Sequence, residues 1–72
     1  MENLNEQITK NIKREIEYSG KSKSQIAKEI GISAPTLSQY LSGRAQPTLA
    51  TLTRLCQTLE ISADDILPVN QK

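Results

Sequence analysis

The chain has 72 residues and a mass of 8.0 kDa, which allows one small domain and leaves no room for a second hydrophobic core. Hydrophobic residues make up 36% of it and charged residues 24%, as in folded chains rather than disordered ones. With two Tyr and no Phe or Trp, its apolar residues are mostly Ile and Leu, which favours packed helices over a sheet. We therefore expect one all-α domain over residues 1–68 and a frayed tail over 69–72.

Several classes of function are excluded by residues that the sequence lacks. It has no His, the usual general base at neutral pH and the commonest zinc ligand. Its single cysteine, Cys56, can form neither an internal disulfide nor a metal cage, which indicates a reducing compartment. The sequence contains no long apolar run and no secretory signal. We expect a cytoplasmic protein that is not an enzyme and that needs no metal, cofactor, membrane or small-molecule ligand.

Charge is unevenly distributed along the chain, although the net charge is only +1. Residues 1–9 carry a net charge of −2, residues 10–44 one of +4 and residues 45–72 one of −1. A basic middle segment indicates one surface suited to an anionic partner. An ordinary solvated surface would give the same asymmetry, so charge alone does not identify that partner.

A first helix is predicted over about Asn5–Ser19. Asn3 is placed to cap its N-terminus, and Gly20 is a natural stop. Apolar residues recur every four positions along it, which predicts one buried stripe made of Leu4, Ile8, Ile12 and Ile16. Near its end, Tyr18 is expected to cover the edge of the core.

Two short helices follow, at about 23–30 and 34–42. Ser22 and Ser33 are placed as their N-caps, and Gly31 ends the first of them. A turn of only three residues holds two such helices at a steep angle, so that the second can enter the major groove of DNA. The same spacing also fits an ordinary helical bundle in which the glycine is merely a stop signal.

The remainder of the chain predicts a loop over 42–47, a fourth helix over about 49–59 and a fifth short helix. The fourth is capped by Thr48, and on its apolar face Cys56 is expected to be a small buried residue rather than a reactive thiol. The fifth begins with the segment 62–65 and is stopped by Pro68.

From residue 22 to residue 67, about two-thirds of the chain, these helices carry a series of motifs in one register: SKSQIAKEIGIS (22–33), PTLSQYLSGR (35–44), PTL (47–49) and LEIS (59–62). The series resembles the lambda-repressor-like family (Cro/CI-type, also called XRE) of helix-turn-helix DNA-binding domains. The resemblance implies a five-helix all-α domain with its helix-turn-helix at about 23–42. It implies a sequence-specific regulator of transcription, acting as a repressor on double-stranded DNA, in the cytoplasm of a bacterium or at a phage genome, associated with the nucleoid.

The resemblance also implies which residues meet the base edges, all of them on the third helix: Ala34, Pro35, Thr36, Ser38 and Gln39. Gln39 has the chemistry for two hydrogen bonds to adenine, through N6 and N7, whereas the hydroxyls of Thr36 and Ser38 discriminate weakly between bases. A plain solvent-facing glutamine is the alternative interpretation of Gln39.

Contacts to phosphate are expected from groups that flank the third helix: Ser22, Lys23, Ser24, Ser42 and Arg44. The first three lie at the start of a helix, where free N–H groups attract anions. Such contacts fix the position of the protein without reading sequence. Lys21 and Lys28 are expected to add to the electrostatic field without touching DNA.

One pair of positions departs from the family pattern. Many members carry an Arg in the first helix that pairs with a Glu near the end of the third, and the corresponding residues here are Ile16 and Leu41. Replacing both charges by hydrophobic residues can be neutral or stabilising, whereas losing only one strands a buried charge. We therefore predict that Ile16 and Leu41 are in contact and take the place of the ion pair.

Family habit implies a homodimer, which would bind a palindromic site. The acidic, Leu-rich C-terminal helices are the expected dimer surface, because this choice leaves the basic segment for DNA. Two alternatives stay open at this point. The domain is a protein-interaction module of the same fold, antitoxin-like or partner-binding, or it is the targeting domain of a larger DNA-processing system.

Overall fold

Four α-helices begin at capping residues, and three of them end at glycines, whereas the fourth ends at Glu60. The structure, a computed structural model, describes residues 3–69. Its helices are α1 (Leu4–Ser19), α2 (Lys23–Ile30), α3 (Ala34–Ser42) and α4 (Leu49–Leu59). Each begins after a residue whose side chain accepts a hydrogen bond from the backbone N–H three positions on, and these caps are Asn3, Ser22, Ser33 and Thr48.

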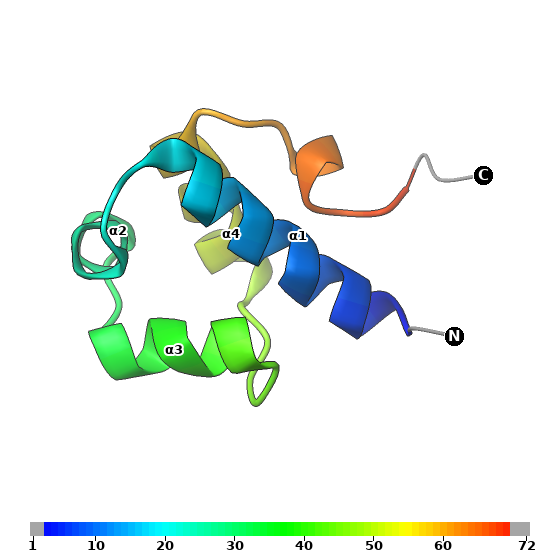
Figure 1. Cartoon of the computed structure of the whole chain (residues 1–72), viewed down its shortest axis with the longest axis horizontal. Helices are drawn as coiled ribbons and strands as arrows, with labels where there is room; N and C mark the ends of the chain where they lie inside the picture. Colours follow the sequence, from blue (N-terminus) through cyan, green and yellow to red (C-terminus); the bar gives the residue numbers. More distant parts are fainter. Residues whose placement is uncertain (1–2, 70–72) are drawn as a thin grey trace.

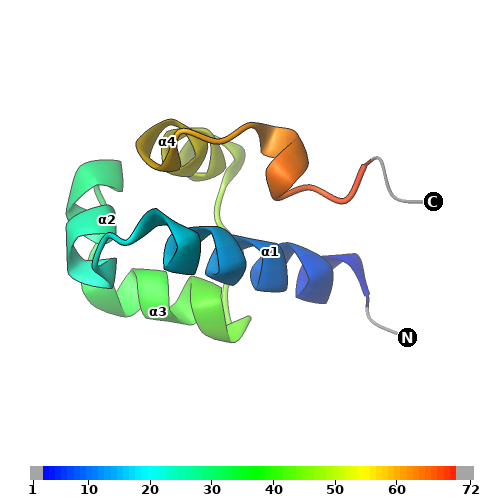
Figure 2. The ribbon, with the colours of Figure 1, turned by 45° about the horizontal axis from the view of Figure 1, so that its top comes forward.

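The helices enclose a single aliphatic core, to which every one of them contributes. Ile26 of α2, Leu37 of α3 and Ile66 near the end of the chain are almost completely buried in it. In Figure 1, α1 and α4 cross in the middle of the molecule while α3 lies along one edge. Figure 2 shows the same arrangement from a second side, with α1 between α3 and α4 and with α2 closing one end.

The predicted fifth helix is wrong, because residues 63–65 form only a single 3-10 turn, η1 (Ala63–Asp65). The backbone N–H groups of Ile66 and Leu67 both donate to the carbonyl of Ala63, and the helix goes no further. Pro68 explains the stop, since it offers no N–H and disfavours a helical conformation of the residue before it. The fold is therefore all-α with four helices and one terminal turn.

The first turn of α1 projects beyond the core, contrary to the prediction of one continuous buried stripe. Leu4 is 63% exposed and Ile8 half-buried, whereas Ile12 and Ile16 are buried as predicted. Tyr18 is also exposed and does not cover the core. Of the expected tail, Val69 is exposed, and residues 70–72 lie outside the described part of the chain.

Side chains of α1 hold the C-terminal turn in place. The Nδ2 atom of Asn11 donates to the carbonyl of Ile66 at 2.8 Å, and an Nη2 hydrogen of Arg14 bonds the carbonyl of Asp65 at 2.9 Å. These carbonyls lie at the C-terminal end of a short helical turn, where no later backbone N–H of the turn is available to bond them. As a result, residues more than fifty positions apart lie side by side, and α3 is left on the edge away from this junction (Figure 1).

Candidate nucleic-acid interface

The helix α3 presents one apolar and one polar side. Leu37 and Leu41 are buried in the core, and Tyr40 is half-buried against it. Ser38 and Gln39, on the opposite side of the helix, are exposed. Because α3 lies along the edge of the molecule (Figures 1 and 2), its polar side is not covered by any other element of the described chain.

Five of the ten residues expected to contact DNA line one shallow surface depression, which we call the α3 depression. Three of them are predicted base-contacting residues of α3 and two are predicted phosphate-binding residues at its C-terminal end: Pro35, Ser38, Gln39, Ser42 and Arg44. The hydroxyl of Ser42 donates to the carbonyl of Gln39 at 3.1 Å, which directs it along the helix. The structure thus brings together the residues with the best chemistry for reading and for holding DNA.

Ala34 and Thr36 lie outside the α3 depression. Ala34 is exposed at the start of the helix, whereas Thr36 is half-buried. The Oγ1 atom of Thr36 shares a 2.7 Å hydrogen bond with the Oγ atom of Ser33, the N-cap of α3. The hydroxyl of Thr36 therefore has a structural partner already, which weakens the expectation that it contacts a base.

The other predicted phosphate-binding residues lie at the start of α2. Ser22 caps this helix by accepting from the N–H of Gln25 at 3.1 Å, and Lys23 and Ser24 are exposed. In Figure 1, α2 stands at the end where α3 begins, and the loop that carries Arg44 leaves from the other end. The two groups of phosphate-binding candidates are therefore separated by the length of α3.

Lys21, immediately before this group, is held by two partners. Its Nζ atom lies 3.1 Å from Oε1 of Glu29 and donates to the carbonyl of Thr58 at 3.1 Å, at the end of α4. Its charge is thus paired inside the fold, and the expectation that it adds a free positive charge to the field is weakened. Lys28 remains an exposed cation on α2.

A charged side chain of α4 that the sequence did not single out lies beside the turn between α2 and α3. Gly31 has φ +81°, in the left-handed region that favours glycine. The Nη1 atom of Arg54 on α4 lies 3.6 Å from the position that a Cβ of Gly31 would occupy. This cation also lies near the C-terminal end of α2, where the helix dipole favours positive charge. No motif or spacing marks Arg54.

Ile16 and Leu41 are both buried, on two helices that pack against each other. Both belong to the same hydrophobic core. This burial agrees with the replacement of both charges of the family's ion pair by apolar residues. Direct contact between Ile16 and Leu41 stays a prediction.

A second, more apolar groove lies between α4 and the C-terminal segment, and we call it the C-terminal groove. Leu49, Cys56, Ile61 and Leu67 are among its lining residues, and Leu49 is 82% exposed. Cys56 is half-buried rather than buried as predicted. Burial and, secondarily, the negative charge of Asp65 raise the pKa of the Cys56 thiol.

Neither a metal site nor a membrane-crossing helix was found in the described part of the chain. No group of three or more His, Cys, Asp and Glu residues is arranged to hold a metal ion between residues 3 and 69. Over the same residues, no helix combines the length and the apolar character needed to span a bilayer.

Two known proteins are similar to this chain, one in sequence and one in fold. A transcriptional repressor of the cryptic phage CTXphi, RstR from Vibrio cholerae serotype O1, is 41% identical over 46 residues, or 64% of this chain. The match spans 41% of that repressor, so the chain corresponds to less than half of its curated relative. The solution structure of the SOS-response transcriptional repressor LexA from Eubacterium rectale has the same fold, with a TM-score of 0.85 and 24% identity. That comparison covers 97% of this chain and 74% of the LexA chain.

The profile of one protein family covers most of the chain. It is the helix-turn-helix family, and the match runs through residues 12–66, from the middle of α1 to the terminal turn. The match includes α2, the turn at Gly31 and α3, which the motifs of the sequence had placed in the same register. The protein belongs to the helix-turn-helix family of lambda-repressor-like (Cro/CI-type, XRE) DNA-binding domains.

Proposed function

We propose that the protein is a sequence-specific regulator of transcription that binds double-stranded DNA with α3 in the major groove and acts as a repressor. The observation that carries this proposal is the α3 depression, where Gln39 of α3 and Arg44 of the loop that follows it line one hollow on an uncovered side of the molecule. A major groove admits one α-helix, and a glutamine amide pairs with adenine there. The similarity to a phage transcriptional repressor supports the direction of regulation.

The role of each group follows from its place around α3. Gln39 reads bases, with Ser38 and the apolar edges of Ala34 and Pro35 as neighbours, and Thr36 contributes least because its hydroxyl is engaged. Arg44 and Ser42 hold the backbone at one end of the helix. At the other end Ser22, Lys23 and Ser24 hold the opposite strand across the groove. Backbone contacts on both sides fix the register in which Gln39 meets its base.

The regulator acts as a homodimer in this proposal, with the C-terminal groove as the surface between the subunits. The support is the apolar lining of this groove and the exposed Leu49 beside it, on a part of the molecule that α3 does not occupy. Exposed apolar patches of this kind often mark interfaces between proteins. A twofold axis there would present two α3 helices to successive major grooves, about 34 Å apart.

In vitro selection of bound duplexes tests the proposal, because it returns specificity, symmetry and half-site spacing in one experiment. We expect enrichment of a palindrome whose half-sites are centred about 10 base pairs apart, or a multiple of that distance. Enrichment of a single, asymmetric half-site would reject the dimer but would still support sequence-specific binding through α3. If neither selected nor random duplexes are bound at low salt, the proposal is wrong and the protein-interaction module of this fold is the alternative that is left.

A further inference from the structure

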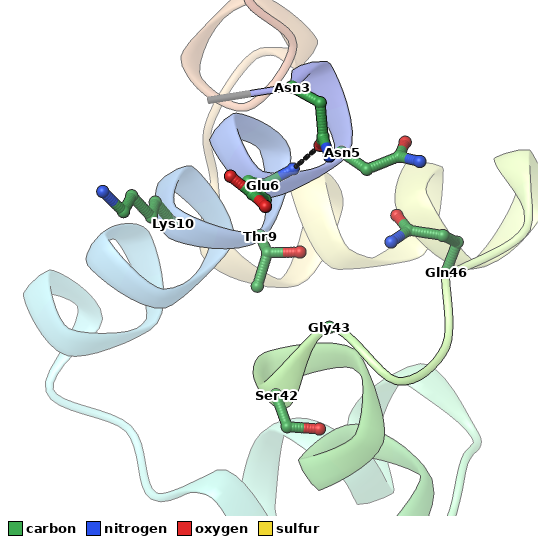
Figure 3. A pocket seen from close by; sticks show the side chains of 8 residues that line it. All are labelled: Asn3, Asn5, Glu6, Thr9, Lys10, Ser42, Gly43 and Gln46. Atoms are coloured by element: carbon green, nitrogen blue, oxygen red, sulfur yellow. Dashed lines mark hydrogen bonds between the residues drawn. The ribbon is translucent and has the colours of Figure 1, made fainter. Parts of the chain in front are cut away.

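A polar groove beside the C-terminal end of α3 lies outside all the contacts assigned above, and we call it the α1–α3 groove (Figure 3). One wall comes from the first two turns of α1, with Asn5 and Thr9, and the other from the loop after α3, with Gln46. In Figure 3 the side-chain amides of Asn5 and Gln46 extend from opposite walls into the space between them. Asn5 and Gln46 are exposed, and Thr9 is half-buried.

This groove is continuous with the α3 depression. Ser42 lines both hollows, and Arg44 and Gln46 lie on the same short loop. In Figure 1 the first turns of α1 come down to the level of α3 at its C-terminal end. A duplex that fills the α3 depression therefore passes the mouth of the α1–α3 groove.

We propose that the α1–α3 groove binds the sugar–phosphate backbone of the same duplex, at the flank of the base pairs that α3 reads. This inference rests on the proposed function and extends its contact surface to α1, for which the sequence assigned no DNA contact. Polar uncharged side chains commonly donate hydrogen bonds to phosphate oxygens. The amides of Asn5 and Gln46 and the hydroxyl of Thr9 supply three such groups around one space, whereas the hydroxyl of Ser42 already donates to the carbonyl of Gln39.

Two charged residues, Glu6 and Lys10, also line the groove, so that its formal charge is close to zero. The amide oxygen of Asn3 is engaged in the cap of α1, where it accepts from the N–H of Glu6 at 2.8 Å. Binding by neutral donors releases few counterions, so these contacts add affinity without steepening the salt dependence. The carboxylate of Glu6 is the unfavourable group, because a phosphate in the groove would repel it.

The first test places a negative charge in the groove with little change of shape. Asn5→Asp is expected to reduce affinity at least tenfold, equally for selected and random duplexes, because phosphate would face a carboxylate. The fold should remain intact, since an acidic residue in the first turn of a helix is favourable. Asn5→Ala and Gln46→Ala each lose one hydrogen bond and should cost about three- to tenfold in affinity, with an unchanged salt slope.

The second test removes a negative charge and has a matched control. Glu6→Gln should raise affinity about threefold, because it relieves the repulsion of a phosphate. Asp64→Asn makes the same change of charge in the terminal turn, which lies away from α3 in both views, and should have a much smaller effect (Figures 1 and 2). Equal effects of the two variants would show that only the overall charge matters, and would overturn the inference.

Hydroxyl-radical footprinting of the bound duplex locates the contact. The wild-type protein should protect sugars beyond the segment covered by α3, and Asn5→Asp should lose this outer protection while the inner protection remains. If Asn5→Asp binds and protects as the wild type does, the groove does not face DNA, even where Gln39→Ala and Arg44→Ala behave as proposed. Failure of the wild-type protein to bind any duplex would instead reject the proposed function, and this inference with it.

Discussion

The guanidinium group of Arg54 lies over Gly31, with Nη1 3.6 Å from the position that a Cβ of residue 31 would occupy. Arg54 belongs to α4, so a residue from outside the helix-turn-helix lies beside the turn that joins α2 and α3. A contact at 3.6 Å is ordinary van der Waals distance, so it leaves space for a methyl group at residue 31.

Gly31→Ala should lower the free energy of unfolding by about 1–2 kcal/mol, because alanine is strained at a φ of +81°. Urea denaturation measures this loss. Gly20→Ala is the matched control, since Gly20 has φ +73° and no neighbour near its missing Cβ. The two variants should lose similar stability if Arg54 accommodates the new methyl group, and an unchanged midpoint for Gly31→Ala would contradict the strain argument.

Ile16 and Leu41 should be energetically coupled if they replace the family's ion pair by an apolar contact. Each single change to Ala removes a buried side chain and should cost about 2–5 kcal/mol. The loss in the double variant should differ from the sum of the two single losses by about 0.5 kcal/mol or more. Chemical denaturation in a stabilising osmolyte gives all three values, and strict additivity would show that the two residues do not touch.

Gln39→Ala should weaken binding to the selected site by about 1–3 kcal/mol, because the bidentate contact to adenine is lost. Binding to random duplexes should be almost unchanged. Titrations of both duplexes at one salt concentration measure the difference. Equal losses on the two duplexes would assign Gln39 to backbone contact instead.

Arg44→Ala should weaken binding to every sequence. It should also reduce the slope of log affinity against log salt by about one, because one phosphate contact no longer releases its counterion. Arg44→Lys keeps the charge and should keep most of the slope. The measurement is a salt series on a random duplex, and an unaltered slope for Arg44→Ala would remove this residue from the interface.

The Cys56 thiol should react slowly in the folded protein. Burial and the charge of Asp65 raise its pKa, so that less of the reactive thiolate is present at a given pH. Because the folded form holds its proton to higher pH than the unfolded form, this group adds stability below its ordinary pKa, and the contribution is lost as the pH rises above it. Iodoacetamide labelling at mildly alkaline pH, with urea-unfolded protein as reference, tests the expectation. Equal rates would contradict it.

Local signals in the sequence were sufficient for the four helices. Serine, threonine and asparagine caps and glycine stops act over three or four residues, so both ends of α2 and α3 followed from the local sequence. The end of α4 has no such signal, because it is capped by Glu60, which adopts φ +57° without being a glycine. The predicted fifth helix is wrong for an equally local reason. Pro68 restricts the residue before it, and only one 3-10 turn fits between Ser62 and that restriction.

The candidate site was predicted only in part, because its remaining features depend on tertiary structure. The sequence pattern indicated Gln39 and Arg44 as candidates. It could not indicate the hydrogen bond between Thr36 and Ser33 or the ion pair between Lys21 and Glu29, because these depend on how the side chains are arranged in the folded chain. The groove between Asn5 and Gln46 joins segments some forty residues apart. No periodicity within either segment indicates the other.

The attachment of Asn11 to the carbonyl of Ile66 determines how short the protein can be made. Ile66 is fully buried, so a chain cut before it loses a core side chain as well as the anchor on α1. The smallest unit that folds therefore extends through the terminal turn, although none of the residues proposed to contact DNA lies there. A protease that trims the chain from its C-terminus should meet resistance at Leu67, and removal of one further residue should abolish cooperative unfolding.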